Sequence, residues 1–183
     1  MRKETCSNRH LILESRFWRA AAVMMPLLFS AVPAAQAQAI GGHMGFVLPL
    51  VTNTSGQTTT LADGFSIGFP VGITVKGKGR FAFDMELVPQ IQDSPRKVSL
   101  TFHPGGLWGI GHGFAVGVRA AFDVNSSQFG FTPLLHKGWP IGKEDGFFKA
   151  YFVEADLPVR FNRPPVGFAT NAVTFAMHFG VGF

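Results

Sequence analysis

The chain contains few of the residues that cross-link or solubilise a protein. Its 183 residues include one cysteine and one tyrosine, and only 15% of them are charged. The single cysteine, Cys6, lies in an N-terminal segment that we expect to be removed, so disulfide and thiol chemistry is excluded from the rest of the chain. No apolar run reaches the length of about 18 residues that a membrane-spanning helix needs, which excludes helical spans. Glycine and phenylalanine are abundant instead, with 22 and 20 residues.

Residues 1–39 have the pattern of a secretory signal peptide. Arg9, Arg16 and Arg19 precede an apolar stretch over 20–32, and a run of small residues follows. This order predicts export through the general secretory route and cleavage after Ala37 or Ala39. The apolar stretch is shorter than the roughly 20 residues of a transmembrane anchor. Residues 40–183 are then one domain by length.

The basic character of the chain belongs partly to this leader. After residue 39 the sequence has eleven Lys and Arg residues against nine Asp and Glu residues, whereas the whole chain has a formal net charge of +5. A nearly balanced charge does not provide the positive surface that nucleic acid requires, so no nucleic-acid partner is expected.

The last eleven residues, 173–183, alternate strictly between apolar residues and small or polar ones. A period of two indicates a strand with two chemically different faces. A tilted strand needs about 9–11 residues to cross a bilayer. Because a free edge on so apolar a strand would pair with other chains, the pattern favours closure into a barrel.

The same alternation recurs in seven further segments. The eight predicted strands cover 41–52, 64–76, 80–91, 97–104, 107–124, 128–141, 147–161 and 173–183. Fifteen of the eighteen phenylalanines after residue 39 fall in the apolar register, and the opposite register is mostly small residues. A water-facing register would be rich in Lys, Glu and Gln. The predicted fold is all-β, an eight-stranded antiparallel up-and-down transmembrane β-barrel, with a secreted β-sandwich as the alternative.

Three aromatic residues orient this barrel. With both chain ends in the periplasm, Trp108, Trp139 and Tyr151 flank the periplasmic turns, where an interfacial aromatic girdle is expected. The external loops are short, and the longest, over 53–63, is rich in threonine.

The chain resembles the small eight-stranded outer-membrane barrel proteins of Gram-negative bacteria, the group of the outer-membrane protein A transmembrane domain and protein X. The resemblance rests on the alternating end of the chain, formed by Phe175, Met177, Phe179, Val181 and Phe183. In that group such an end is the signal for the barrel-assembly machinery, and the third residue from the end is often Tyr rather than Val. The resemblance implies a location in the bacterial outer membrane, in contact with its lipid and lipopolysaccharide.

The inward register carries the candidate functional residues. The residues predicted at or above the middle of the membrane form a lumenal charge network: Asp84, Glu86, Arg119, Asp123, Glu154, Asp156 and Arg160. Those predicted toward the periplasmic end are His43, Lys76, Arg80, His103, His136 and His178. Buried charges of both signs are expected to pair, because an unpaired one is costly. The lumen is therefore predicted to be polar, salt-bridged and plugged.

These features predict a non-enzymatic monomer with a structural or interaction role, without a cofactor. Two alternatives are a narrow, porin-like passive channel and an acyl enzyme that modifies lipid A. Acyl chemistry needs a hydroxyl beside a histidine and an orienting group, for which His103, Ser99 or Thr101, and Glu86 are the candidates. The histidines lie on separate strands without close ligand spacing, so no metal site is expected.

Overall fold

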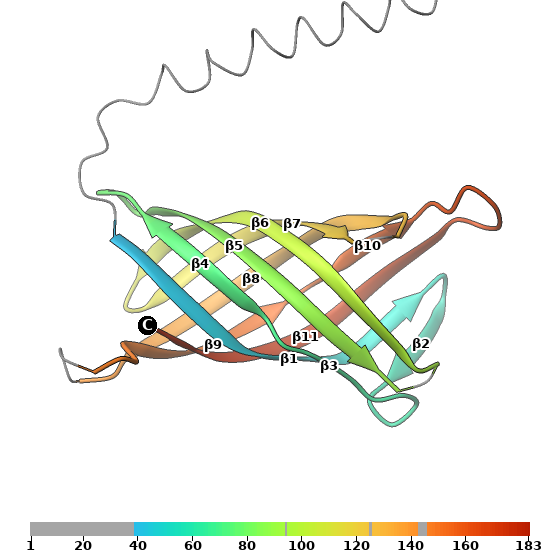
Figure 1. The fold of residues 1–183 in the computed structure, drawn as a ribbon, viewed down its shortest axis with the longest axis horizontal. Helices are drawn as coiled ribbons and strands as arrows, with labels where there is room; N and C mark the ends of the chain where they lie inside the picture. The colour runs from blue at the N-terminus through green and yellow to red at the C-terminus, as the bar shows by residue number, and fades with distance from the viewer. Residues whose placement is uncertain (1–38, 94, 125, 143–145) are drawn as a thin grey trace, which may run out of the picture. The chain divides into compact units, whose positions relative to one another are not determined.

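The computed structural model describes residues 39–93, 95–124, 126–142 and 146–183. Apart from Ala39, the predicted signal peptide lies outside these residues, as does the predicted cleavage after Ala37. Ala39, the second predicted cleavage point, is the first residue of strand β1. The regular elements in the described ranges are strands (Figure 1). No helix long and apolar enough to span a membrane is found among them.

Eleven strand segments form one antiparallel sheet, which confirms the predicted all-β antiparallel class. They are β1 (Ala39–Thr54), β2 (Gln57–Thr60), β3 (Ser66–Gly68), β4 (Val71–Lys76), β5 (Phe81–Gln92), β6 (Lys97–Gly111), β7 (Phe114–Asp123), β8 (Gln128–Pro140), β9 (Ala150–Asp156), β10 (Val159–Asn162) and β11 (Thr170–Gly182).

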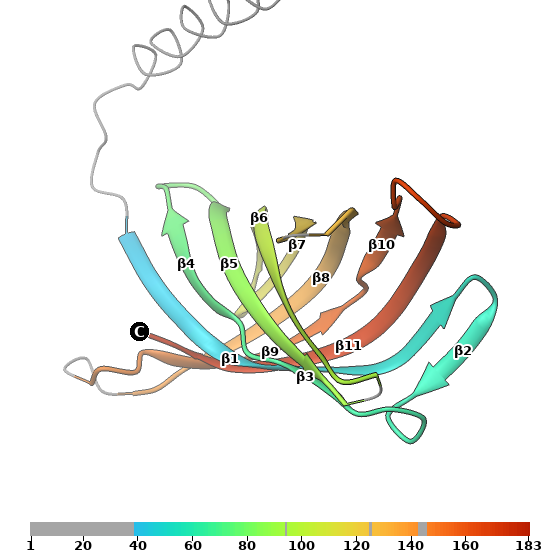
Figure 2. The same cartoon turned by 45° about the vertical axis from the view of Figure 1, so that its right-hand side comes forward.

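The strand pairings return to the strand at which they begin. β1 pairs with β11 on one side and with β3 and β4 on the other. From β3 and β4 the pairings pass through β5, β6, β7 and β8 to β9 and β10, and from these to β11 (Figures 1 and 2). β3 and β4 share both neighbours and are interrupted at Pro70, and β9 and β10 share both neighbours and are interrupted at Pro158. Proline lacks the N–H that a strand ladder requires, so each interruption falls at a residue without a backbone donor.

Successive residues of each strand lie on opposite faces of this sheet. In β5, Asp84 and Glu86 are 1% and 2% exposed, whereas Phe83 and Leu87 are 44% and 47% exposed. This alternation is the geometric consequence of the extended backbone. The buried inner face therefore carries small and charged side chains, and the outer face carries large apolar ones.

One predicted turn is wrong. The sequence pattern predicts separate strands over 97–104 and 107–124 with a turn between them, but β6 is continuous through Gly105 and Gly106. A Cβ on Gly105 would lie 2.6 Å from the Cα of Arg119, and one on Gly106 would lie 2.6 Å from the Phe81 ring. These glycines provide room for bulky neighbours within the sheet and do not turn the chain.

The turn lies instead between β6 and β7. Gly111, His112 and Gly113 have φ angles of 105°, 54° and 78°. Left-handed backbone of this kind is favourable for glycine and rare for other residues. Neighbouring strands, which sequence composition does not reveal, decide which glycines bend the chain.

The predicted 53–63 loop also contains regular structure. β2 pairs with the end of β1 around a turn at Ser55 and Gly56, whose φ angles are 51° and 92°. Beyond β2, Asp63 accepts hydrogen bonds from the backbone N–H and the hydroxyl of Thr60, at 2.7 and 2.9 Å. These bonds, the backbone one above all, hold the pKa of Asp63 below its ordinary value.

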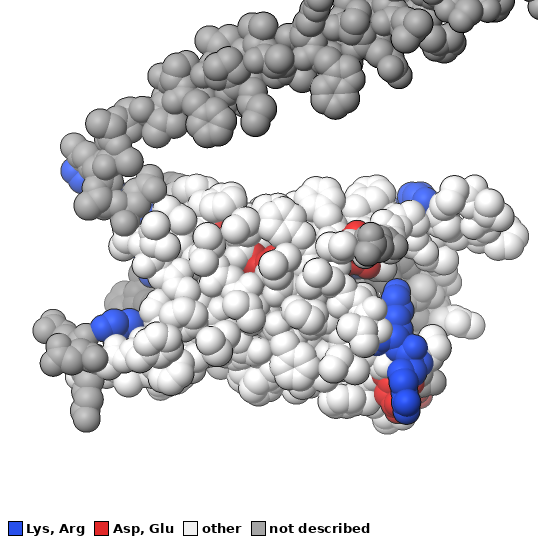
Figure 3. All heavy atoms as spheres, viewed as in Figure 1, with Lys and Arg blue, Asp and Glu red and all other residues white. Residues whose placement is uncertain are grey.

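The outer surface has few charges between the two ends of the sheet. Figure 3 shows a broad, mostly uncharged band on one face, with a few acidic atoms visible in it and with Lys and Arg side chains toward the two ends. Many large apolar side chains of the outer face are 40–54% exposed, among them Val71, Phe114, Val118 and Phe122. Contiguous apolar surface of this extent requires a covering medium or partner.

Candidate functional site

A buried ion-pair cluster lies on the inner face of the sheet, with Arg119 of β7 at its centre. Arg119 is 2% exposed, and its Nε donates to Asp84 over 2.7 Å. Its two terminal nitrogens donate to both carboxylate oxygens of Glu154, at 2.9 and 3.2 Å. One of them also lies 3.2 Å from Glu86. A planar guanidinium with three carboxylate partners is held in one orientation, because bidentate pairs fix geometry as well as charge.

Histidines form a second layer around these carboxylates. His43 Nε2 lies 2.9 Å from Glu86, and His136 Nδ1 lies 2.9 Å from Glu154. The Nδ1 of His178 lies 3.0 Å from the other oxygen of Glu154. Three carboxyl groups thus surround one guanidinium, so the acidic side chains of the cluster outnumber its one arginine. The three imidazoles add further hydrogen-bonding groups around these carboxyl groups.

The strand pattern brings this cluster together. Asp84 and Glu86 are two residues apart on β5, and so share a face. β9 places Glu154 on its inner face by the same rule. The pairing of Gly105 with Arg119 leaves space beside the arginine for its side chain to cross the interior.

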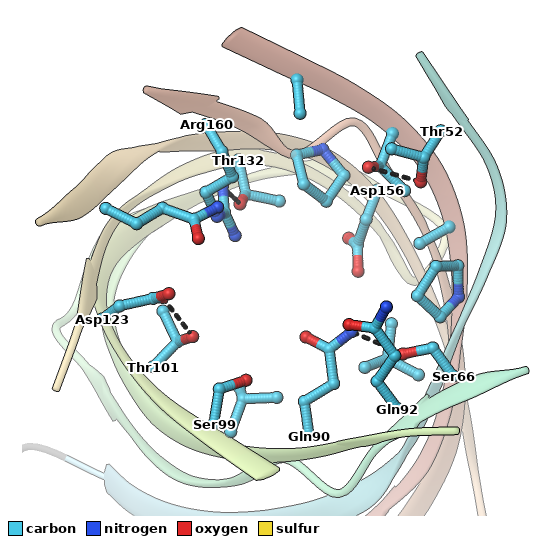
Figure 4. A pocket seen from close by; sticks show the side chains of 18 of the residues that line it. Thr52, Ser66, Gln90, Gln92, Ser99, Thr101, Asp123, Thr132, Asp156 and Arg160 are labelled. Atoms are coloured by element: carbon cyan, nitrogen blue, oxygen red, sulfur yellow. Dashed lines mark hydrogen bonds between the residues drawn. The ribbon is translucent and has the colours of Figure 1, made fainter. Parts of the chain in front are cut away.

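Two cavities, each of about 380 Å³, open on either side of the cluster. We call the first the hairpin-side cavity, because residues of β1 and β2 such as Thr52 and Thr60 line it (Figure 4). We call the second the termini-side cavity, because Ala39 and Phe183 line it. Arg119 lines both cavities. The ion-pair cluster therefore separates them.

The hairpin-side cavity is lined mainly by hydroxyl and amide groups. Thr101 donates to Asp123 over 2.7 Å, and Gln90 donates to Ser66 over 2.6 Å (Figure 4). Arg160 donates to Thr132 over 3.1 Å, and it also lies 3.1 Å from His103 Nε2. Asp156 differs from these residues. Its carboxylate points into the cavity, and its buried Oδ1 has no hydrogen-bond partner.

The residues predicted for the periplasmic end are divided between the two cavities. His43, Lys76 and His136 line the termini-side cavity, whereas His103 and His178 line the hairpin-side cavity. Arg80 lies exposed beside the start of β5 and lines neither cavity. The period of two predicted that these side chains point inward. It did not predict their position along the long axis of the sheet, because strand tilt and register depend on the pairing partners.

The proposed acyl-transfer group is not assembled by these residues. The Thr101 hydroxyl donates to Asp123, and Ser99 lies opposite Gln90 in the strand pairing. His103 lies 3.8 Å from Glu86 and contacts Arg160. A hydroxyl activated by a histidine requires direct hydrogen-bond contact between the two.

The predicted girdle residues lie on the outer face. Trp108, Trp139 and Tyr151 are 52%, 36% and 48% exposed. Trp139 stacks on Tyr151 with ring centres 5.1 Å apart. The tryptophans of β6 and β8 thus lie near the strand ends at which the chain turns or leaves the sheet.

The end of the chain packs against the beginning of the described sheet. Phe179 stacks on Phe46 at 5.4 Å, and Phe183 stacks on Phe147 at 5.0 Å. The backbone N–H of Phe183 donates to the carbonyl of Gly42 over 2.8 Å. Of the other residues in the alternating end, Phe175 is 43% exposed, whereas Met177 and Val181 are half-buried.

Sequence reasoning missed the hydroxyl partners of the charged residues. Thr74 donates to Asp84 over 2.7 Å and Thr101 donates to Asp123. The hydroxyl of Thr132 accepts a hydrogen bond from Arg160. The sequence alternation places these threonines on the inner face. Which charged side chain each threonine contacts depends on how neighbouring strands are paired. Phe152 lies on the inner face, unlike most phenylalanines of the chain, and packs against three histidine rings.

The comparisons with known proteins leave the family open. No family model and no curated protein matches the chain. Among solved structures, the chain is similar to a de novo designed transmembrane β-barrel, with 11% identity over 80% of this chain and 100% of that one and a TM-score of 0.39. It is also similar to the outer membrane protein OprG from Pseudomonas aeruginosa, with 12% identity over 81% of this chain and 97% of that one and a TM-score of 0.38. At these TM-scores neither likeness carries an inference, and the resemblance to the protein A and protein X group stays a prediction.

Proposed function

We propose that the chain is an eight-stranded β-barrel of the bacterial outer membrane, with a structural or interaction role and a lumen closed by the Arg119 cluster. Three observations support this proposal: the cyclic strand pairings, the apolar outer face and the charged inner face. In this reading β3 with β4, and β9 with β10, are single membrane passes. β2 extends the β1 hairpin beyond the membrane.

The position of Arg119 is the main support for a closed lumen. This residue lines both cavities, is almost fully buried and is held by three carboxylates. A solute passing between the cavities would have to break these ion pairs. Removing one partner from a buried ion pair costs about 3–5 kcal/mol. The closed form is therefore the stable one.

The second candidate is a narrow ion channel, and one feature favours it. Among the described residues, Arg119 is the one that lines both cavities, so a shift of its side chain is the movement that could join them. Planar-bilayer recording distinguishes the two candidates. The closed lumen predicts no stepwise conductance from the wild-type protein or from the control Asp123→Asn. Stepwise wild-type conductance that changes on Glu154→Gln, but not on Asp123→Asn, would favour the channel.

The proposal extends to assembly and surroundings. Residues 1–39 would direct secretion, and the strand that ends at Phe183 would be the segment that the barrel-assembly machinery binds. The outer apolar face would contact membrane lipid and lipopolysaccharide, and the protein would act as a monomer. Deletion of Phe183 tests the assembly step: we expect less protein in the outer-membrane fraction, and an unchanged amount would contradict this role.

A further inference from the structure

Two buried side-chain atoms in the described part of the chain have no hydrogen-bond partner: Asp156 Oδ1 and His178 Nε2. The two residues are 5% and 1% exposed, and both line the hairpin-side cavity. Asp156 of β9 pairs with Ala176 of β11, two residues before His178, so both orphaned atoms belong to one wall. Buried polar atoms are almost always partnered, which indicates that this wall has a binding partner in solution.

The strand pairing limits what that partner is. Residues that are diagonal neighbours on antiparallel strands, as Asp156 and His178 are, lie about 7–8 Å apart. None of the groups of described residues whose ligand atoms are close enough to share a metal ion includes Asp156. A partner that reaches both residues is therefore a molecule with several polar groups.

The charges of the cavity favour a neutral molecule. Apart from histidines, the charged residues that line it are three acidic and three basic ones: Glu86, Asp123, Asp156, Lys97, Arg119 and Arg160. Equal numbers of the two signs give the cavity no strong preference for an anion or a cation, because clefts that select a charge are lined by one sign.

The uncharged polar lining indicates which polar groups the molecule carries. Seven threonines, two serines and three glutamines line the cavity, and their side chains both donate and accept hydrogen bonds. Figure 4 shows Gln90 and Ser99 pointing into the cavity that the Asp156 carboxyl group also enters. A ligand hydroxyl donates and accepts as well, so it matches Asp156 and His178 in either protonation state.

We propose that the hairpin-side cavity binds a neutral polyhydroxyl molecule of monosaccharide size, with Asp156 as its principal anchor. One hydroxyl bonds to the Asp156 carboxyl group, a neighbouring one bonds to His178, and the others bond to threonine and glutamine side chains. The cavity volume of about 380 Å³ is at the lower end of the range of about 300–1,000 Å³ for ligand pockets, which suits so small a molecule.

The ligand enters from the hairpin end, where the exposed Thr59 and Thr60 of β2 line the cavity. This site goes beyond the proposed structural role, and it holds whether or not the lumen conducts ions.

Saturation-transfer NMR of the full chain, in a detergent without sugar headgroups, tests the site. The neutral probes are glucose, galactose, mannose, xylose and sorbitol, and the charged analogues are glucosamine and glucuronate. We expect saturable binding of at least one neutral probe, weakened at least about tenfold by Asp156→Leu, which removes the carboxyl group at similar size. Asp156→Asn, which keeps the shape of the side chain, should give a smaller loss. The matched control is Lys76→Gln in the termini-side cavity, which should bind as the parent does.

Unfolding of the ligand-free proteins separates lost binding from lost structure. Asp156→Leu removes an unpartnered polar group, so its melting temperature should equal or exceed that of the parent. Absence of saturable binding by all five neutral probes would overturn the proposal, because the orphaned atoms would then bond to water alone. Tighter binding of glucosamine or glucuronate than of glucose would overturn it as well, because the site would then select charge. Equal losses in Asp156→Leu and Lys76→Gln would also contradict it.

Discussion

The two faces of the sheet are made by alternate residues of the same strands, yet they have opposite chemistry. Val118 and Arg119 are consecutive residues of β7: the valine is 51% exposed on the outer face, and the arginine is 2% exposed in the interior. A water-soluble protein buries the apolar side chain and exposes the charged one. The inversion agrees with the lipid-facing outer surface that we propose, and it places the charged side chains of these strands in the interior.

The largest expected effect comes from the inner face. Replacing Arg119 with Met leaves Asp84, Glu86 and Glu154 buried without their common partner. We expect a loss of about 3–5 kcal/mol in the free energy of unfolding, measured by urea denaturation in lipid vesicles. Arg119→Lys, which keeps the charge but not the fork of donors, should lose less. A loss below about 1 kcal/mol for Arg119→Met, as for a surface ion pair, would contradict the buried network.

At the neighbouring position on the outer face, gaining a charge should destabilise the protein, as losing a charge does on the inner face. Val118→Lys places a charge on the face that we assign to lipid, at the height of the Arg119 cluster. The expected cost is about 2–4 kcal/mol in the same assay, whereas Val118→Leu should have little effect. If Val118→Lys were tolerated as well as Val118→Leu, the outer face would not be lipid-facing.

A smaller effect is expected from the glycine that makes room between the strands. A Cβ at Gly105 would lie 2.4 Å from the carbonyl oxygen of Val118, so the backbone must shift. Gly105→Ala should cost about 1–3 kcal/mol. Gly77→Ala is the matched control, since nothing lies within 4 Å of its added Cβ. Equal stability of the two variants would show that the close approach of β6 and β7 is not needed.

The smallest effect concerns a single hydrogen bond in the hairpin-side cavity. Thr101→Val keeps the side-chain shape and removes the 2.7 Å bond to Asp123. A loss of about 1–2 kcal/mol is expected from the unfolding curves. The loss should disappear in an Asp123→Ala background, where the acceptor is absent, and an equal loss in that background would contradict the contribution of this bond.

The sequence predicted which face of the sheet a side chain lies on. It did not predict the position of that side chain along the barrel axis, or the residues that it contacts. Strict alternation predicted the inward side of Asp84, Glu86 and Glu154, since a period of two follows from the extended backbone alone. It did not place His103 and His178 at the hairpin-side cavity, because the height of a residue depends on the tilt and register of neighbouring strands.

The misplaced turn has the same cause. Pro104, Gly105 and Gly106 have the local composition of a turn, but the Arg119 and Phe81 side chains beside them favour glycine inside a strand. These contacts join residues that are distant in sequence. The unpartnered state of Asp156 was equally invisible, because it depends on the distances to every neighbour and not on its own register.

Fluorescence quenching by brominated lipid tests the central claim, that the outer face contacts lipid and the interior is enclosed. In a Trp18→Phe background the fluorescence comes from Trp108 and Trp139, both on the outer face. The account predicts strong quenching in vesicles of lipid brominated near the headgroup, and weak quenching by a water-soluble quencher. Strong quenching by the water-soluble reagent, with no response to brominated lipid, would contradict it.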